Sequence, residues 1–214
     1  PLLIDPWITY FGGLNNEFGA SIATDANGNV IFVGKVNSVT NFPIQGAAQG
    51  ILVAGYDSYV SKMDQAGSLV WSTYYGGSGL DEAYGVHADP TTNDIYFCGG
   101  TTSSNFPIGA AVGQTSFLNT YPGIRSAYLV KFTPAGTRLW STFYGDITGV
   151  TYAADITTDA NGDVVMVGTT GSNTNIATAA TSIIISRARS ARCATRTRPN
   201  GVKPKARERS TRSA

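Results

Sequence analysis

The chain has little charge, little sulfur and almost no histidine for its length. Of its 214 residues, 14% are Asp, Glu, Lys or Arg, and there are two cysteines, two methionines and one histidine. Two cysteines do not make a disulfide framework, and they do not complete a zinc site alone. No apolar run of about 18 residues occurs, so no transmembrane helix is expected. These absences disfavour a disulfide-stapled scaffold, a zinc protein and a helical membrane protein.

Glycine and aromatic residues are abundant instead. The chain has 25 Gly, 11 Tyr, 9 Phe and 3 Trp, and 42% of its residues are hydrophobic. This composition is typical of short strands joined by tight turns, because aromatic residues favour strands and glycine favours turns. A helical bundle would be dominated by Lys, Glu, Leu and Ala. We therefore expect an all-β protein with a sizeable core.

The sequence repeats itself. A first element reads WITYFGG, WSTYYGG and WSTFYGD, and its copies begin at Trp7, Trp71 and Trp140. A second reads DANGNVIFVG, DPTTNDIYFCG and DANGDVVMVG, and its copies end at Gly34, Gly99 and Gly168. NFPI occurs twice, followed by YVSKMDQAG from Tyr59 and YLVKFTPAG from Tyr128. Elements that recur in one order indicate a tandem repeat, with a period of roughly 65 residues.

Each unit predicts four short antiparallel strands. DANG and the later Ala-Gly pairs are turn sequences, and β-branched or aromatic residues flank them. The long polar segments 37–55 and 102–125 are expected to be surface loops. One sheet cannot bury its apolar face alone, so successive sheets should stack radially as a β-propeller. Within the propeller region 1–175 we expect a fourth strand of a preceding blade at 7–11, blades at 19–75 and 83–144, and a partial blade at 152–170.

Taken together, these motifs resemble the bacterial seven-bladed β-propeller repeat (SBBP) family over roughly residues 7–170. The resemblance implies a secreted or cell-surface protein, and it carries over no catalytic residues. The chain starts without Met, and two and a half blades do not close a ring. We therefore expect a fragment of a longer protein, whose open blade edges invite self-association. The strict repetition of the tryptophans indicates packing between blades rather than stacking on sugars.

The segment 176–214 departs from the repeat. It holds ten of the 15 Lys and Arg residues from Ile184 onward and has no aromatic residue. Such a low-complexity basic segment is expected to be disordered. It could be a basic arm for nucleic acid or another anionic surface, a contact to the acidic body, or a frameshifted gene end. The abrupt loss of the repeat favours the frameshift, so nucleic acid is not the expected partner.

Three sets of side chains deserve a chemical hypothesis. His87 is the one histidine, with Asp89 two residues on, but no Ser or Cys nucleophile stands in a recognisable elbow. Alternating oxygen side chains resemble the start of a calcium loop, although no acid follows at the twelfth loop position. These calcium candidates are Asp25, Asn27, Asn29, Asp159, Asn161 and Asp163. Plain hairpin turns explain the same pattern, and no cofactor is expected.

The third set is acidic. Asp81 and Glu82, with Asp57, could be a carboxylate pair for glycoside chemistry, which needs two acids about 5–10 Å apart across a cleft. Neighbouring acids on a Gly-rich loop are usually just solvated. The prediction for function is therefore a non-catalytic surface scaffold that binds an extracellular protein or glycan through its loops. A propeller hydrolase or lyase acting on polysaccharide and a spacer without a ligand are the alternatives.

Overall fold

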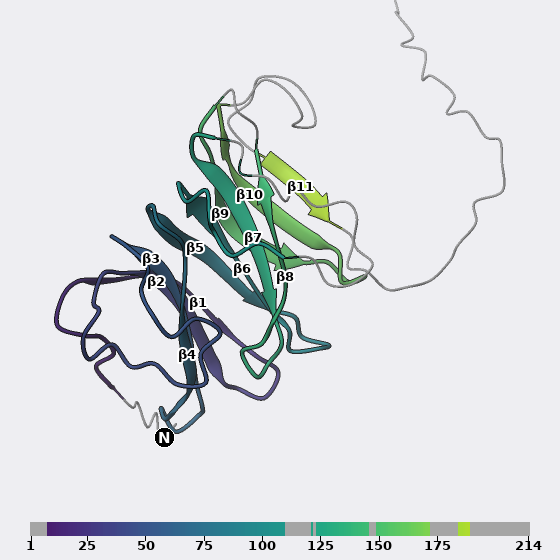
Figure 1. Ribbon diagram of the computed structural model, residues 1–214. Coiled ribbons are helices and arrows are strands. Elements are labelled where there is room, and N and C mark those ends of the chain that lie inside the picture. Colours follow the sequence, from purple (N-terminus) through teal and green to yellow (C-terminus); the bar gives the residue numbers. More distant parts are fainter. Residues whose placement is uncertain (1–7, 110–120, 122, 146–148, 172–183, 189–214) are drawn as a thin grey trace, which may run out of the picture.

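The computed structural model describes residues 8–109, 121, 123–145, 149–171 and 184–188, the last of these as backbone only. Every regular element in this part of the chain is a β-strand, which confirms the all-β prediction (Figure 1). Because the described residues form no helix, none of them belongs to a helix that could cross a membrane.

The strands form three antiparallel sheets, which we call blades 1, 2 and 3. Blade 1 consists of β1 (Glu17–Thr24), β2 (Val30–Val36), β3 (Asp57–Met63) and β4 (Leu69–Tyr75). Blade 2 consists of β5 (Asp81–Ala88), β6 (Ile95–Thr101), β7 (Ser126–Phe132) and β8 (Arg138–Tyr144). Blade 3 consists of β9 (Thr151–Thr158), β10 (Val164–Thr170) and β11 (Ile184–Ala188). Within each blade the strands are neighbours in chain order.

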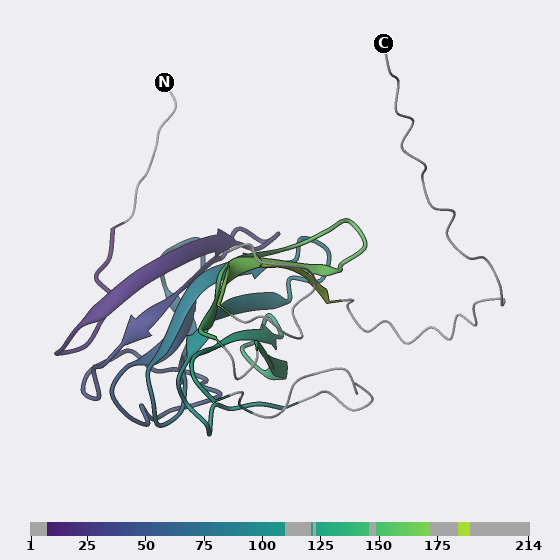
Figure 2. The same cartoon turned by 90° about the horizontal axis from the view of Figure 1, so that it is seen from above.

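The blades stack face to face (Figure 2). The core lies in the seams between them. In the seam between blades 1 and 2, β5 contacts β1, β2 and β3, and Val33, Phe97 and Val130 are fully buried. In the seam between blades 2 and 3, β9 contacts β5, β6 and β7 around Leu129 and Met166. The next blade thereby removes each apolar strand face from water. This burial stabilises the fold by roughly 25 cal/mol for each Å² of apolar surface buried.

The first strand of every blade carries a β-bulge, and a glycine of the second strand lies opposite it. The pairing register of β1–β2, β5–β6 and β9–β10 shifts at this point. A Cβ atom added to Gly34, Gly99 or Gly168 would overlap the bulge carbonyl oxygen of Phe18, Glu82 or Tyr152. The glycine that ends the second sequence motif is therefore required by close backbone approach.

The expected strand at 7–11 is not formed over residues 8–11, and Trp7 lies outside the described residues. Strand geometry needs a hydrogen-bonding neighbour, and the described chain supplies none to this segment. Phe11 nevertheless packs on blade 1, with ring centroids 5.0 Å from Phe32 and 5.3 Å from Phe42. In blade 2 the corresponding rings, Phe97 and Phe106, are met in the same way by Tyr75 from blade 1. Phe11 thus contributes to blade 1 as a preceding blade would.

The sequence predicts disorder over 176–214, and within that segment residues 184–188 form β11, which pairs with β10. Ile184 lies opposite Gly168, as Tyr59 lies opposite Gly34 and Tyr128 opposite Gly99. Arg187 has the register position of Lys62 and Lys131. IISRA is therefore the third-strand motif with isoleucine in place of tyrosine, a residue with comparable strand propensity. The other residues of 176–214, apart from 184–188, lie outside the described part.

The described parts of the long segments, 37–55 and 102–109, return along the outer strand of their own blade. Gln45 and Ser72 exchange backbone hydrogen bonds of 3.2 and 2.8 Å, and Gly109 bridges to Ser141 on β8. Phe42 is buried at the start of the first loop. The NFPI motif is therefore a packing element that ties each loop to its sheet.

Replacing Gly99 with Ala is expected to lower the free energy of unfolding by about 2–4 kcal/mol, because the new methyl group overlaps the Glu82 carbonyl and the bulge must move. Urea denaturation measures the difference. Gly50→Ala is the matched control, since no atom lies within 4 Å of its Cβ position. Equal stabilities of the two variants would contradict the close approach.

Candidate functional site

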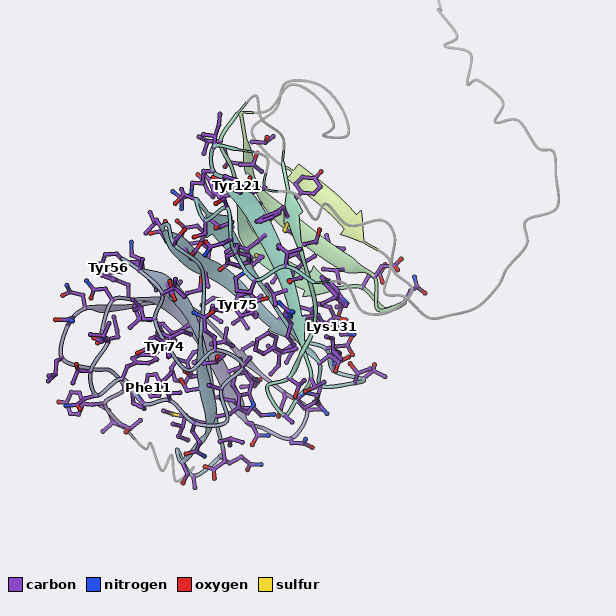
Figure 3. The ribbon with its side chains drawn as sticks, in the orientation of Figure 1. Phe11, Tyr56, Tyr74, Tyr75, Tyr121 and Lys131 are labelled. Carbon is purple, nitrogen blue, oxygen red and sulfur yellow. The ribbon has the colours of Figure 1, made fainter. Side chains whose placement is uncertain are left out.

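The candidate site is a row of charged and aromatic side chains across all three blades, at the end that carries the long loops. We call it the charged–aromatic strip, and it consists of Phe18, Lys35, Tyr56, Glu82, Tyr84, Arg125 and Tyr152. Tyr56, which is labelled in Figure 3, belongs to the part of the strip on blade 1. Phe18, Glu82 and Tyr152 are the second residues of β1, β5 and β9.

Glu82 connects blade 1 to blade 2. Its Oε1 lies 2.5 Å from the Lys35 Nζ, and its Oε2 accepts hydrogen bonds from Arg125 and, at 2.6 Å, from the Tyr84 hydroxyl. Burial alone raises the pKa of Glu82, but the hydrogen bonds from Lys35 and Tyr84 and the charge of Arg125 hold it below its usual value. Glu82 is therefore a carboxylate that two cations share.

Aromatic rings flank both cations. The Lys35 Nζ lies 5.1 Å from the centroid of the Phe18 ring and 5.3 Å from that of Tyr56. The Arg125 guanidinium lies 5.8 Å from the Tyr152 ring centroid. Such cation–π contacts are each worth about 0.5–2 kcal/mol and hold the cations in place.

Arg125 owes its position to a missing side chain. A Cβ atom on Gly100 would lie 2.8 Å from the Arg125 Nε and 3.2 Å from the Tyr152 Cβ. Lys35 has the position of Gly100 in blade 1, because Lys35 pairs with the second residue of β3 and Gly100 pairs with the second residue of β7. The glycine thus opens the space through which Arg125 extends from blade 2 toward blade 3.

The strip is accessible to a ligand. Phe18 is 49% exposed, and the side chains of Lys35 and Arg125 are 30% and 24% exposed, whereas Glu82 is buried. Exposed ring faces can pack on the C–H faces of a sugar or another apolar group, and the two cations can pair with an anion. The arrangement is suited to binding, because its single carboxylate is held ionised between two cations and cannot act as a general acid.

The acids proposed for glycoside chemistry point to different places. Adjacent side chains of a strand point to opposite sides, so Glu82 joins the strip while Asp81 lies near Asp57, beside Gly76. Asp57 and Asp81 are both fully buried, so the expectation that these acids are solvated is wrong. A sugar ring cannot reach two carboxylates that have no exposed surface.

His87 and Asp89 both lie near Thr158 of blade 3. The His87 Nε2 lies 2.9 Å from the Thr158 hydroxyl of blade 3, and burial lowers the pKa of His87. One oxygen of Asp89 accepts hydrogen bonds from the backbone of Thr91 and Thr92 in its own turn. The two side chains are placed as an inter-blade contact and a turn cap.

The calcium candidates lie in the β1–β2 and β9–β10 turns. Both oxygens of Asp25 accept hydrogen bonds from Asn29, one from its backbone and one from its amide, and Lys62 lies 2.8 Å away. One oxygen of Asp159 accepts the backbone N–H groups of Asn161 and Asp163. Asn27 donates its own backbone N–H to Asp25. In the described ranges, no three His, Cys, Asp or Glu side chains gather in a way that could hold a metal ion.

The repeated aromatic residues face the seams. Trp71 is 2% exposed and donates a 3.0 Å hydrogen bond from its indole to the Pro134 carbonyl of blade 2. Trp140 is likewise buried, against Tyr96. The Tyr128 hydroxyl lies 2.7 Å from the Ser58 hydroxyl of blade 1.

No family profile matches the chain. The chain is similar to the "Uncharacterized WD repeat-containing protein L264" of Acanthamoeba polyphaga mimivirus, with 28% identity over 189 residues. The match covers 78% of this chain and 14% of that protein, so the chain spans a small part of the relative's length. Together with the four-stranded antiparallel sheets, the similarity identifies a β-propeller-like repeat. The finer resemblance to SBBP repeats stays a prediction.

Sequence reasoning missed the strip. Lys35, Glu82 and Arg125 are separated by more than forty residues from one another, so no local motif links them. An alignment of the repeats with one another could have pointed to the strip. Phe18, Glu82 and Tyr152 occupy the same position in the three blades, and the residue after each pairs with the glycine that ends the second motif. Positions that vary chemically on a constant backbone are candidates for function.

Glu82→Gln is expected to lower the free energy of unfolding by about 1–3 kcal/mol at neutral pH, because Lys35 and Arg125 lose their shared carboxylate. The pKa of Glu82 is depressed in the folded protein. Its contribution is therefore present above the ordinary glutamate pKa and is lost as the pH falls. Urea denaturation at several pH values between 3 and 7 should show the two proteins converging at the acid end. A difference that grows toward low pH would contradict this assignment.

Proposed function

We propose that the protein is a non-catalytic β-propeller interaction scaffold that binds an anionic carbohydrate through the charged–aromatic strip. The observation that carries the proposal is the strip itself, in which two partly exposed cations are each set beside exposed or half-buried aromatic rings. An acidic sugar presents both features that this surface recognises, a carboxylate or sulfate and apolar C–H faces.

The scaffold role has further support. The similar viral protein is named as a WD repeat-containing protein, and the strip is built on strands and loop ends that three stacked blades hold in place. A site on rigid elements binds with little ordering cost. The buried positions of Asp57 and Asp81 favour this role over a polysaccharide hydrolase or lyase. We also propose an extracellular or cell-surface location, which rests on the sequence resemblance; detection of the full-length protein on intact cells tests it.

Lys35→Ala and Tyr152→Ala are each expected to weaken binding of an acidic oligosaccharide by about tenfold or more, because each removes a cation or a ring face from the strip. A glycan array of matched neutral and acidic sugars selects the ligand, and isothermal calorimetry measures the affinity. Binding should weaken with salt, as expected for a charged contact.

Val70→Ser is the control for the binding experiment. Val70 is 42% exposed on β4 and is not part of the strip, so its replacement should leave the affinity unchanged. Circular dichroism is used to check that each variant is folded. The absence of binding to any acidic glycan, or a protein that binds equally well after Lys35→Ala and Tyr152→Ala, would overturn the proposal, and no ligand at all would favour a spacer.

We further propose that the chain self-associates through the face of blade 1 that no other described blade covers. Ile22 is 69% exposed there, whereas the corresponding Val86 and Ile156 in blades 2 and 3 are each 5% exposed against the blade before them. The face is therefore built like one that receives another blade.

Replacing Ile22 with Glu is expected to shift the chain toward the monomer, because the charge blocks burial of this face. Light scattering coupled to size-exclusion chromatography, over a concentration series, measures the change. Val39→Glu is the matched control, since Val39 is also 69% exposed but lies in a loop. A wild-type chain that stays monomeric at every concentration would contradict self-association.

A further inference from the structure

Two carboxylates meet inside the seam between blades 1 and 2. Asp57 begins β3, Asp81 begins β5, and neither has any exposed surface. The point where a Cβ atom of Gly76 would stand is 2.6 Å from Asp57 Oδ1 and 2.7 Å from Asp81 Oδ2. Oxygens of both carboxylates therefore approach the same point, in the space left by the missing side chain of Gly76.

The two carboxylates are hydrogen-bonded unequally. Asp81 Oδ2 accepts hydrogen bonds of 2.7 Å from the Gly77 backbone and from the Ser103 hydroxyl, and Oδ1 accepts one from Thr101. Asp57 Oδ2 accepts two hydrogen bonds, but Asp57 Oδ1 is buried without a partner. Asp81 thus has hydrogen bonds to both oxygens that stabilise its ionised form, whereas Asp57 Oδ1 accepts no hydrogen bond that would stabilise a negative charge.

No cation balances the pair among the residues that the structure describes. The ion pairs of Lys35, Lys62, Arg125 and Lys131 go to Glu82, Asp25 and Asp94. The charge of Asp57 or Asp81 raises the pKa of three tyrosines on neighbouring elements. They are Tyr74 on β4, Tyr121 in the second long loop and Tyr128 on β7. Two adjacent buried negative charges without compensation would be strongly unfavourable.

The fold itself does not require acids at this place. In the seam between blades 2 and 3 the same two positions hold Ser126 and Thr151. The backbone contact is unchanged, because Asp81 donates its N–H to the Tyr56 carbonyl and Thr151 donates to the Arg125 carbonyl, both at 2.8 Å. The seam between blades 2 and 3 therefore has neutral hydroxyl groups at the two positions where the seam between blades 1 and 2 has carboxyl groups.

We propose that Asp57 and Asp81 share a single proton, held on Asp57, which makes the seam between blades 1 and 2 a pH-responsive joint. The joint is closed while the proton is bound and is loosened when both acids are ionised, because their repulsion then acts directly between the two blades.

The direction of the pH effect follows from the buried state of the pair. Burial, with the charge of Asp81 added to it, raises the pKa of Asp57 to about 7, from an ordinary value of 3.8. Burial also raises the pKa of Asp81. The folded protein therefore holds a proton that the unfolded chain has already released. Stabilisation by this proton is complete below the ordinary aspartate pKa and is lost as the pH rises through about 7.

The test compares the full chain with Asp57→Asn by urea denaturation between pH 5 and 8. For each unit of pH between about 5 and 7, the unfolding equilibrium constant of the wild type should rise up to about tenfold relative to that of the variant. Asn resembles the protonated acid, so the variant should be the more stable protein at pH 8. His87 is common to both proteins, and its lowered pKa gives a dependence of opposite sign, so it cancels in the comparison.

A second variant guards against a folding defect in the first. Asp57→Ser combined with Asp81→Thr installs the residue pair of the other seam and should likewise remove the alkaline loss. Asp64→Asn is the control, because Asp64 caps an exposed turn and its replacement should leave the pH dependence unchanged. Carbon-13 NMR of the aspartate carboxyl groups should show one that titrates near neutral pH and is missing from the Asp57→Asn variant.

Two results would overturn the proposal. Wild-type and variant curves that stay parallel from pH 5 to 8 would show that the pair binds no proton in this range. A wild-type midpoint that rises with added Ca²⁺ or Na⁺ at pH 8, without a similar rise in Asp57→Asn, would show that a cation rather than a proton neutralises the pair.

Discussion

The structure depends on one constraint, that the apolar face of each sheet must be covered by the sheet of the next unit. Val33 and Val60 of blade 1 have no exposed surface because Phe97 and Val130 of blade 2 lie against them. Phe11 shows how strong the constraint is, since a segment without strand structure still fills the place on blade 1 that Tyr75 fills on blade 2. Stability in such an array is a sum of units and of the seams between them.

At certain equivalent positions of this repeated backbone, the type of side chain changes from one blade to the next. The second residue of the first strand is phenylalanine in blade 1, glutamate in blade 2 and tyrosine in blade 3. The first residue of the third strand is Asp57 in blade 1 and Ser126 in blade 2. The backbone contacts around these positions are preserved, as the two 2.8 Å hydrogen bonds between successive blades show. The repeat therefore separates the residues that maintain the fold from those that are free to acquire a function.

The sequence contains most of the fold, because turns and strand positions recur at constant spacing. The glycine that ends the second motif identified its strand, although only the structure shows that the reason is the bulge opposite it. The strand at 184–188 was missed because isoleucine replaces the expected tyrosine, and pattern matching weighs identity where the backbone needs only strand propensity. The charged–aromatic strip and the Asp57–Asp81 pair could not be predicted from the sequence. Their members come from different blades, and side-chain contacts between blades leave no local sequence pattern.

The return of the long loops along β4 and β8 has a consequence for how the protein can aggregate. Gln45 and Gly109 occupy backbone groups of the outer strands that would otherwise be free to bind a foreign strand. Lateral growth into amyloid-like ribbons is thereby obstructed at the rim of both complete blades. Assemblies that involve blades 1 and 2 should therefore grow by adding units along the direction in which the blades stack, rather than at the edges of their sheets.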